Sequence, residues 1–280
     1  MEKAEEIIQL FKQVRTLPHI ISRLTRLIND ENSTLQDFEE VIRSDPALVA
    51  RLLTLVNSSY YGVVRKVDSI SRAVALLGMK NLHNIAMTDA LQAMAGRDNI
   101  HGTFSFNRLW LHCTACGICC KMIAERIFSI NGDDAYLTGI LHDIGLIVEV
   151  QVDERNFIRA FDALTADPPS IVELENRYLG TDHCRIGYLL AREWLLADPI
   201  AEAIRDHHAV TDDLTPASAR GILQLSEYIV SQLGYPMKSG VSLPLAPVLA
   251  NHLQDNMAEY KVLAEDLPDE ISRIRDMYEN

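Results

Sequence analysis

Histidines and one aspartate recur through the middle of this chain at positions that could form a metal centre. His112 comes first, followed by the pair His142-Asp143 in the run Leu-His-Asp-Ile-Gly, then His183, and then the doublet His207-His208. Neutral imidazole and carboxylate are the groups that hold ions such as iron, manganese and zinc. An adjacent His-Asp pair offers a nitrogen and an oxygen, and a carboxylate can bridge two ions. These six residues therefore predict a metal site.

The predicted chemistry is hydrolysis of a phosphoester. Two ions bridged by Asp143 and surrounded by imidazoles would lower the pKa of a bound water and polarise a phosphoryl oxygen. His142 and Asp143 are accordingly the predicted catalytic residues.

Four charged residues near these positions are candidates for supporting roles. Lys121 and Arg185 each share a helix with a candidate ligand and could bind the leaving phosphate, although a solvated surface position is the simpler interpretation. Arg205 and Asp206 directly precede the histidine doublet, so they could orient its imidazole rings. The isolated His19, His83, His101 and His252 are expected to be surface or hydrogen-bonded core residues instead of ligands.

The elements that must position these residues are helices nearly throughout, because apolar residues recur at spacings of three and four. Ser33-Thr34 caps a helix that runs to Arg43, and Pro46 begins the next one. Residues 69–78 and 82–94 predict two further helices. We expect an all-α fold with a helical N-terminal subdomain over 1–100 packed on a metal-binding helical bundle over 101–235. Residues 236–280 would form a helical C-terminal extension.

The cysteines allow two interpretations. Four of the five lie between Cys113 and Cys120, and the Cys-x-x-Cys-x-x-Cys run resembles an iron–sulfur ligand spacing. The same residues fall inside an amphipathic stretch over 108–130, where buried cysteine acts as a small hydrophobe. No glycine- or proline-rich loop surrounds them, so we favour a packed helix face.

Composition limits the classes of function. The chain has 280 residues, 48% hydrophobic and 23% charged, as in an ordinary globular protein. A net charge of −13 argues against nucleic-acid binding. No apolar run is expected to cross a bilayer and the first residues do not form a signal peptide, so we expect a cytoplasmic protein without membrane association.

Short motifs in a fixed order give the chain a family resemblance. They are Leu17-Pro18, Ser44-Asp45-Pro46-Ala47-Leu48, Asn57-Ser58-Ser59-Tyr60-Tyr61-Gly62, the Ser69 to Gly78 segment, Gly139-Ile140-Leu141-His142-Asp143-Ile144-Gly145, Gly180-Thr181-Asp182-His183, Gly187, Trp194 and Ala203-Ile204-Arg205-Asp206-His207-His208. Together these resemble the HDOD domain, an offshoot of the HD superfamily of metal-dependent phosphohydrolases, over about residues 10 to 235. The resemblance implies an all-α fold and a signalling or regulatory role.

The same resemblance implies a ligand set. His112 matches the first histidine of the HD pattern, and His142-Asp143 is the pair that gives the superfamily its name. His183 and His207-His208 match further histidines of the HD-GYP branch, which hydrolyses cyclic di-GMP. Glu227 aligns with the last ligand, which is ordinarily an aspartate. The GYP tripeptide is absent, since Ala209-Val210-Thr211 follows the doublet.

Two functions follow as hypotheses. The first is a signalling protein that retains an HD-type metal site and communicates with a protein partner or a nucleotide ligand, with residues 57–62 as a candidate contact for the partner. The second is an active phosphohydrolase acting on a nucleotide or cyclic dinucleotide. Both imply one or two divalent transition-metal ions, with iron, manganese, nickel and zinc all compatible with nitrogen and oxygen ligands. The oligomeric state stays open.

Overall fold

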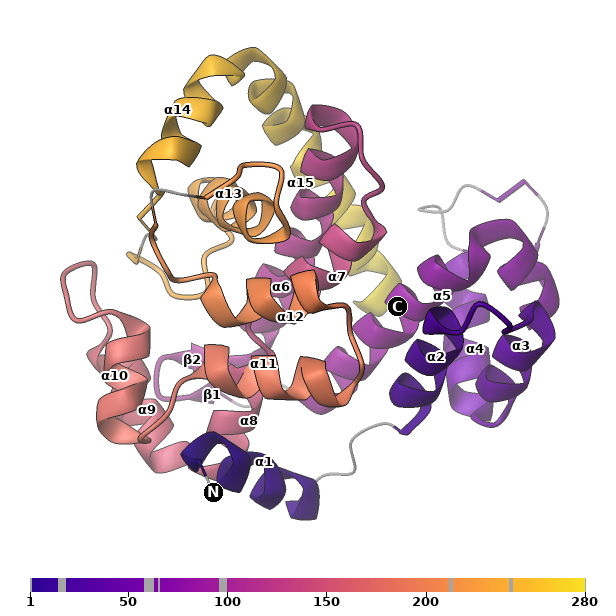
Figure 1. Ribbon diagram of the computed structural model, residues 1–280, viewed down its shortest axis with the longest axis horizontal. Coiled ribbons are helices and arrows are strands. Elements are labelled where there is room, and N and C mark those ends of the chain that lie inside the picture. The colour runs from indigo at the N-terminus through magenta and orange to yellow at the C-terminus, as the bar shows by residue number, and fades with distance from the viewer. Residues whose placement is uncertain are drawn as a thin grey trace.

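The protein is all-α, as predicted (Figure 1). The computed structural model describes residues 2–14, 19–57, 63–64, 66–95, 100–211, 214–241 and 244–279. Within these residues the strands are two short ones, β1 (Ile100–His101) and β2 (Phe104–Ser105), which pair as an antiparallel hairpin. The predicted break at Leu17-Pro18 and most of the turn over 57–62 lie outside the described residues.

The N-terminal helices are α1 (Lys3–Val14), α2 (His19–Asn29), α3 (Leu35–Arg43), α4 (Pro46–Val56) and α5 (Ile70–Ala95). Of these, α3 and α4 begin where the sequence predicts. Thr34 caps α3 by accepting a hydrogen bond from the backbone of Asp37, whose side chain bonds back to Thr34. The two predicted helices over 69–94 are joined across Gly78, which has a positive φ of 77° and kinks α5.

Helices α2 to α5 surround a core of their own, whereas α1 packs elsewhere. Leu24, Phe38 and Leu52 are fully buried in the core of α2 to α5. Phe11 of α1 instead belongs to the larger core formed by the central helices, and α1 lies against α8 and α11. Figure 1 shows α2 to α5 as a lobe at one side of the molecule, with α1 beneath the central helices. Residues 1–100 thus contribute to two cores.

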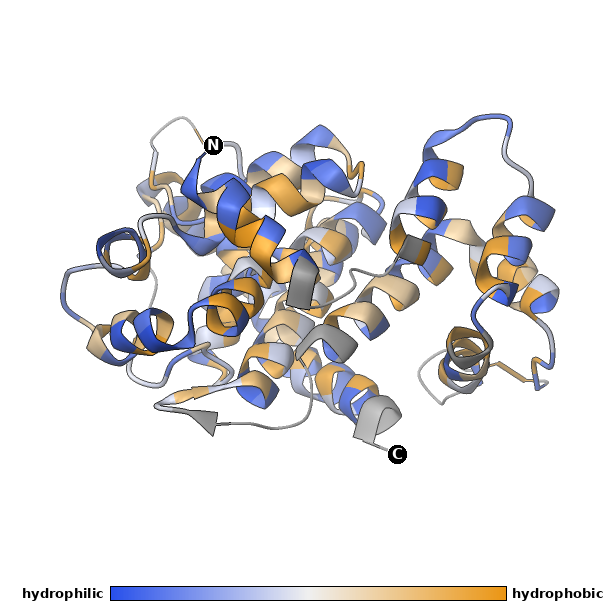
Figure 2. Cartoon of the chain, turned by 90° about the horizontal axis from the view of Figure 1, so that it is seen from below, coloured by the Kyte–Doolittle hydropathy of each residue, from blue (hydrophilic) through white to orange (hydrophobic). Residues whose placement is uncertain are grey.

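The central and C-terminal helices form the rest of the molecule. They are α6 (Phe106–Met122), the π-helical turn η1 (Ile123–Ile127), α7 (Asp133–Leu141), α8 (Ile144–Val152), α9 (Glu154–Ala163), α10 (Ile171–Tyr178), α11 (His183–Glu193), α12 (Asp198–Asp206), α13 (Ala219–Gln232), α14 (Pro247–Asp255) and α15 (Met257–Glu279). Their apolar faces turn toward one another and their polar faces outward (Figure 2). The single helix predicted over 108–130 therefore ends at Met122 and continues as one π turn.

Helix α6 is buried on both sides and links the two larger cores. Leu109 and Cys113 pack with α7, α8 and α9, whereas Cys116, Cys119 and Cys120 pack with α13 and α15. All of these cysteines are free and buried. The packed helix face predicted for the cysteine run is confirmed.

One stretch qualifies for a membrane span by length and composition, contrary to the sequence prediction. It covers Asp133–Val152, and 78% of its most apolar window is buried inside the protein. The stretch is two helices, α7 and α8, separated at His142-Asp143. It packs as a core element of the bundle.

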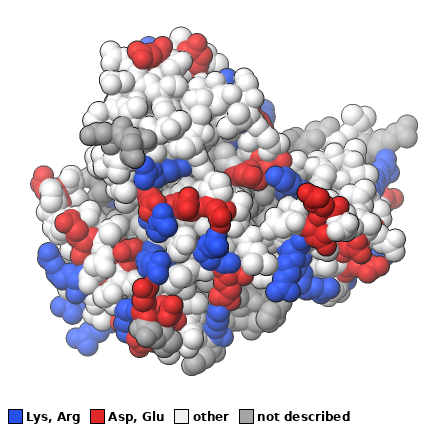
Figure 3. All heavy atoms as spheres, in the orientation of Figure 1, with Lys and Arg blue, Asp and Glu red and all other residues white. Residues whose placement is uncertain are grey.

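Acidic and basic side chains are intermingled on the face seen in Figure 3. Several of them form exposed ion pairs, such as Lys12 with Glu193 and Arg126 with Asp266, both at 2.6 Å. Exposed pairs of this kind contribute little to stability, about 0 to 1 kcal/mol each. The fold is therefore held mainly by its apolar cores.

His83 predicts an acid-sensitive step in the stability of the α2 to α5 lobe. It is a hydrogen-bonded core residue, with its Nε2 2.9 Å from Thr25 Oγ1, and burial lowers its pKa from 6.5 to about 4. Because the folded pKa lies below the unfolded one, stability should fall as the pH drops from 6.5 toward 4, by about 3 kcal/mol at 1.4 kcal/mol per unit. A His83→Gln variant should lose less. Thermal unfolding across this pH range measures it, and parallel curves for the two proteins would contradict it.

Candidate metal centre

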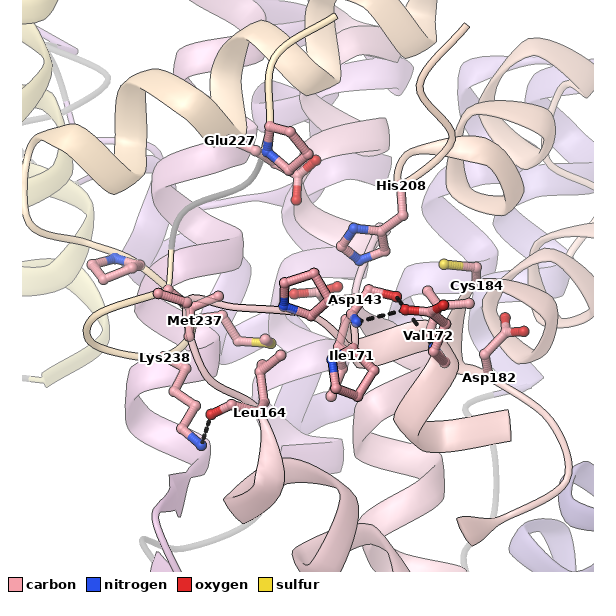
Figure 4. Close-up of a pocket in the computed structure, with 18 of the residues that line it drawn as sticks. Asp143, Leu164, Ile171, Val172, Asp182, Cys184, His208, Glu227, Met237 and Lys238 are labelled. Atoms are coloured by element: carbon pink, nitrogen blue, oxygen red, sulfur yellow. Dashed lines mark hydrogen bonds between the residues drawn. The ribbon is translucent and has the colours of Figure 1, made fainter. Parts of the chain in front are cut away.

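All seven predicted ligand residues meet in the interior of the bundle. His112 lies in the middle of α6, the His142-Asp143 pair forms the junction of α7 and α8, and His183 is the first residue of α11. His207 and His208 follow α12, and Glu227 is on α13. Figure 4 shows Asp143, His208 and Glu227 directed into one pocket between these helices.

Asp143 divides the surrounding side chains into two groups. Its Oδ2 lies 3.2 Å from His142 Nε2 and 3.8 Å from His112 Nε2. Its Oδ1 lies 3.4 Å from His183 Nε2 and 3.6 Å from His207 Nε2. One carboxylate therefore faces two clusters of imidazole nitrogens, one with each oxygen, which is the arrangement of a bridging ligand.

Each group has one further ligand-type residue. Glu227 Oε1 lies 3.6 Å from His142 Nε2 in the first group. His208 Nε2 lies 3.1 Å from His183 Nε2 in the second. The first group is thus His112, His142, Asp143 and Glu227, and the second is His183, His207, His208 and Asp143. The glutamate at the last position reaches the cluster despite its extra methylene.

Three of the imidazoles have their orientation fixed by backbone carbonyls on the side away from the cluster. The Nδ1 atoms of His112, His142 and His207 lie 2.7–2.8 Å from the backbone carbonyls of Tyr235, Gly139 and Ile204. A carbonyl only accepts, so these Nδ1 atoms donate, and the neutral rings present unprotonated Nε2 atoms to the cluster. The carbonyl contacts therefore select the tautomer that a metal ligand needs.

Unprotonated nitrogens facing one another need a cation between them. His183 Nε2 and His207 Nε2 are 3.3 Å apart, and the buried His142 Nε2 and Glu227 Oε2 have no hydrogen-bond partner. Two lone pairs at such a distance repel unless a proton or a metal ion lies between them, and buried polar atoms without partners are costly. The donor set is the one that suits divalent transition metals.

The charges of the site are strongly coupled. Burial lowers the pKa of His112 to about 4. Burial also opposes protonation of His183 and His207, yet contact with Cys184 and nearby carboxylates raises the pKa of both rings well above the usual value. Burial would raise the pKa of Asp143, but His142 and its neighbours hold it well below its usual range. In the absence of a metal, protons therefore supply the positive charge around Asp143.

Two buried glutamates behind His183 were not predicted. Glu175 is fully buried on α10, and its Oε2 accepts hydrogen bonds from His183 Nδ1 at 2.7 Å and from the His183 backbone at 3.1 Å. Glu149 of α8 is also fully buried, and burial together with the charge of Glu175 raises its pKa well above the usual value. Neither lies in one of the motifs identified in the sequence.

Removing the charge of Glu175 should weaken the second group. In Glu175→Gln, His183 keeps a neighbour of the same shape but loses the carboxylate that makes its ring more basic. We expect metal affinity to fall about 10- to 100-fold, as for other partners of ligating histidines. Titration with zinc or cobalt measures this. Glu173→Gln, two residues earlier and exposed, is the matched control, and equal affinities in the two variants would show that Glu175 does not support His183.

The four charged residues considered for supporting roles form ion pairs with other side chains. Arg205 and Asp206 pair with each other at 2.7–2.8 Å, while Ile204 orients His207. For His207, the backbone carbonyl of Ile204 and not this pair orients the ring. Lys121 pairs with Glu125 and Asp133, and Arg185 with Glu2. The simpler expectation of surface positions holds for both.

A cavity of about 700 Å³ opens onto the site. His112, Asp143, His208 and Glu227 line its floor, and its walls come from the segment over 164–173 and from residues 236–241. Lys238 joins the two walls by donating to the carbonyls of Phe161 and Leu164, the latter at 2.8 Å (Figure 4). A ligand in this cavity would touch the candidate metal ligands.

An all-α bundle with a His-Asp pair between two buried helices, ringed by further histidines, defines the chain as an HD-type protein. The sequence profile of the HDOD domain matches residues 14–210. This chain belongs to the HDOD family. The resemblance identified from the motifs is confirmed.

One curated protein is similar to most of this chain. A curated uncharacterised protein of Treponema pallidum (strain Nichols) is 28% identical over 212 residues. The match covers 73% of this chain and 39% of that protein, so the chain spans about two fifths of its curated relative.

Solved structures show the same fold. An HDOD domain protein with unknown function from Geobacter sulfurreducens gives a TM-score of 0.68 at 23% identity, over 98% of this chain and 94% of that one. A protein of Marinobacter aquaeolei VT8 described as a signal transduction protein gives 0.75 at 22% identity, over 95% and 60%. One of Shewanella amazonensis SB2B described as a phosphohydrolase gives 0.62 at 25% identity, over 93% and 97%.

Proposed function

We propose that this protein is a regulatory HDOD protein that binds divalent transition-metal ions through its retained HD residues. The carrying observation is the pair of imidazole clusters that face the two oxygens of Asp143. His112, His142 and Glu227 would hold one ion and His183, His207 and His208 a second, with Asp143 between them. Such ions, when bound, supply positive charge for anionic oxygens and make a bound water more acidic.

The regulatory role is supported by the separate α2 to α5 lobe and by the cavity. The lobe has a core of its own and contacts the central bundle through α5. Its partner would be a signalling protein, with the metal site or a nucleotide in the cavity setting the state that the partner detects.

An active phosphohydrolase is the second candidate, and the cavity over Asp143 favours it. A nucleotide or cyclic dinucleotide would place a phosphate at the cavity floor. Such ligands carry several negative charges, yet the cationic side chains among the described lining residues are already engaged. Arg205 pairs with Asp206, and Lys238 bonds to backbone carbonyls. The cavity therefore suits a ligand whose negative charge is confined to the one phosphate at the metal site better than a ligand with several charged groups.

Metal analysis of the purified chain tests the proposal. We expect one to two equivalents of a transition metal per chain, either as purified or after addition of zinc or cobalt. Less than about a tenth of an equivalent under both conditions would contradict the proposal, since a site of useful affinity fills under these conditions.

Turnover by the metal-loaded protein separates the two candidates. For the regulatory protein we expect no hydrolysis of nucleotides or cyclic di-GMP, whether or not these ligands bind. Hydrolysis that is lost in Asp143→Ala would establish the phosphohydrolase instead.

A further inference from the structure

Cys184 lies beside the second group of histidines and has no role in the function proposed above. It is in the first turn of α11, directly after His183, and 4% of it is exposed. Figure 4 shows its sulfur directed toward His208 and Asp143. The sulfur is 3.4 Å from His183 Nε2.

We propose that Cys184 is a thiolate ligand of the ion held by His183, His207 and His208. The proposal rests on the metal-binding function proposed above and adds a sulfur donor to it. All four residues offer a ligand atom within 4.8 Å of one another. The second centre would then be a three-histidine, one-cysteine site beside the carboxylate of Asp143.

The spacing of these atoms fits a tetrahedral shell. With metal–nitrogen distances near 2.05 Å and a metal–sulfur distance near 2.3 Å, neighbouring ligand atoms are about 3.3 Å apart for two nitrogens and about 3.6 Å for nitrogen and sulfur. His183 Nε2 lies 3.3 Å from His207 Nε2, 3.1 Å from His208 Nε2 and 3.4 Å from Cys184 Sγ. These three edges, all measured from His183 Nε2, match a four-ligand zinc shell. Cys184 Sγ approaches the His207 ring at Nδ1, at 3.8 Å, so binding would require a shift of the sulfur toward Nε2 of that ring.

The other cysteine near a histidine is placed differently. Cys116 Sγ lies 3.7 Å from His112 Nε2 and 3.9 Å from His112 Nδ1. Nearly equal distances to both ring nitrogens place this sulfur alongside the imidazole, one helical turn away, and not at the lone pair of Nε2. Cys184 is therefore the sulfur that we assign to the metal.

A thiolate changes which ion the centre prefers and how open it is. Sulfur ligands favour zinc over manganese, whereas oxygen ligands favour manganese and magnesium. Four protein donors beside the shared oxygen of Asp143 would fill the shell of that ion and leave little room for water on it. The exchangeable position would belong to the ion held by His112, His142 and Glu227.

Cobalt substitution tests the assignment by absorption, independently of activity. Cobalt(II) bound to thiolate has a charge-transfer band in the near ultraviolet that imidazole and carboxylate ligands do not produce. We expect this band in the cobalt-loaded parent protein, its loss in Cys184→Ala, and its retention in Cys116→Ala and in Cys119→Ala, a buried cysteine on α6 away from the cluster. Circular dichroism establishes that each variant is folded.

The outcomes distinguish the thiolate assignment from the metal-binding function on which it rests. Failure of the parent to bind cobalt would overturn both. Bound cobalt without the band, or a band that survives in Cys184→Ala, would overturn the thiolate assignment alone. As a second measurement, the ratio of zinc to manganese affinity should fall at least about tenfold in Cys184→Ala. An unchanged ratio would also overturn the assignment.

Discussion

Replacing Asp143 by alanine should remove metal binding from both groups while leaving the helices folded. Among the described residues, Asp143 is the only carboxylate with one oxygen within 4 Å of each imidazole cluster. Loss of a group behind a ligating histidine costs about 10- to 100-fold in affinity, so loss of a carboxylate shared by two ions should cost about 100-fold or more. Any phosphodiesterase activity should disappear with it.

Calorimetric zinc titration and metal analysis measure the effect, and far-ultraviolet circular dichroism checks the fold. Asp206→Ala is the matched control, because Asp206 lies next to His207 in the chain but pairs with Arg205. We expect the control to change metal affinity by less than about threefold, since its ion pair is partly exposed. Zinc affinity in Asp143→Ala equal to that of the control would exclude the bridging arrangement.

The pH dependence of metal binding follows from the same geometry. His183 and His207 have raised pKa values and hold protons in the metal-free protein, which a metal ion must displace. Binding should therefore release protons, and affinity should increase with pH through the range in which these rings titrate. Protons and a metal ion would thus compete for the same imidazole nitrogens around Asp143.

The residues that converge around Asp143 could be predicted from sequence because most of them sit in ordered motifs. The pair His142-Asp143 and the doublet His207-His208 are recognisable by residue type, and the helices that carry them follow from apolar spacing. Their separation into two groups was not predictable. It depends on which oxygen of Asp143 faces which histidine, and that depends on how α6, α8 and α11 cross.

Glu175, Glu149 and Cys184 were missed for a related reason. A carboxylate in an amphipathic helix looks the same in sequence whether it is solvated or buried behind a ligand. Cys184 is a lone cysteine next to His183, while the conspicuous cysteine run on α6 is core packing. What sets these three residues apart from the other glutamates and cysteines is the burial of the side chain and the direction in which it points, and both depend on the three-dimensional packing.

The second large effect is expected from Gly145→Ala. Gly145 lies in the first turn of α8, directly after the segment that carries Asp143, and a Cβ there would lie 2.1 Å from the His183 carbonyl oxygen and 2.6 Å from His183 Cα. Both atoms are backbone, so α8 and α11 would have to separate by about 1 Å. Overpacking of this kind costs about 3 kcal/mol, or about 5 °C in Tm for a chain of this size.

The same displacement should act selectively on metal binding. Asp143 lies on the α8 side and His183 on α11, so their 3.4 Å contact would lengthen, while His142 moves together with Asp143. The second group should therefore lose affinity before the first, which two-site zinc titration resolves. Gly117→Ala in α6 is the control. Its added Cβ would lie 3.2 Å from Tyr136 O, a milder contact, and the substitution adds about 1 kcal/mol of helix propensity. Equal Tm values for the two variants would show that close crossing of α8 and α11 does not hold the centre together.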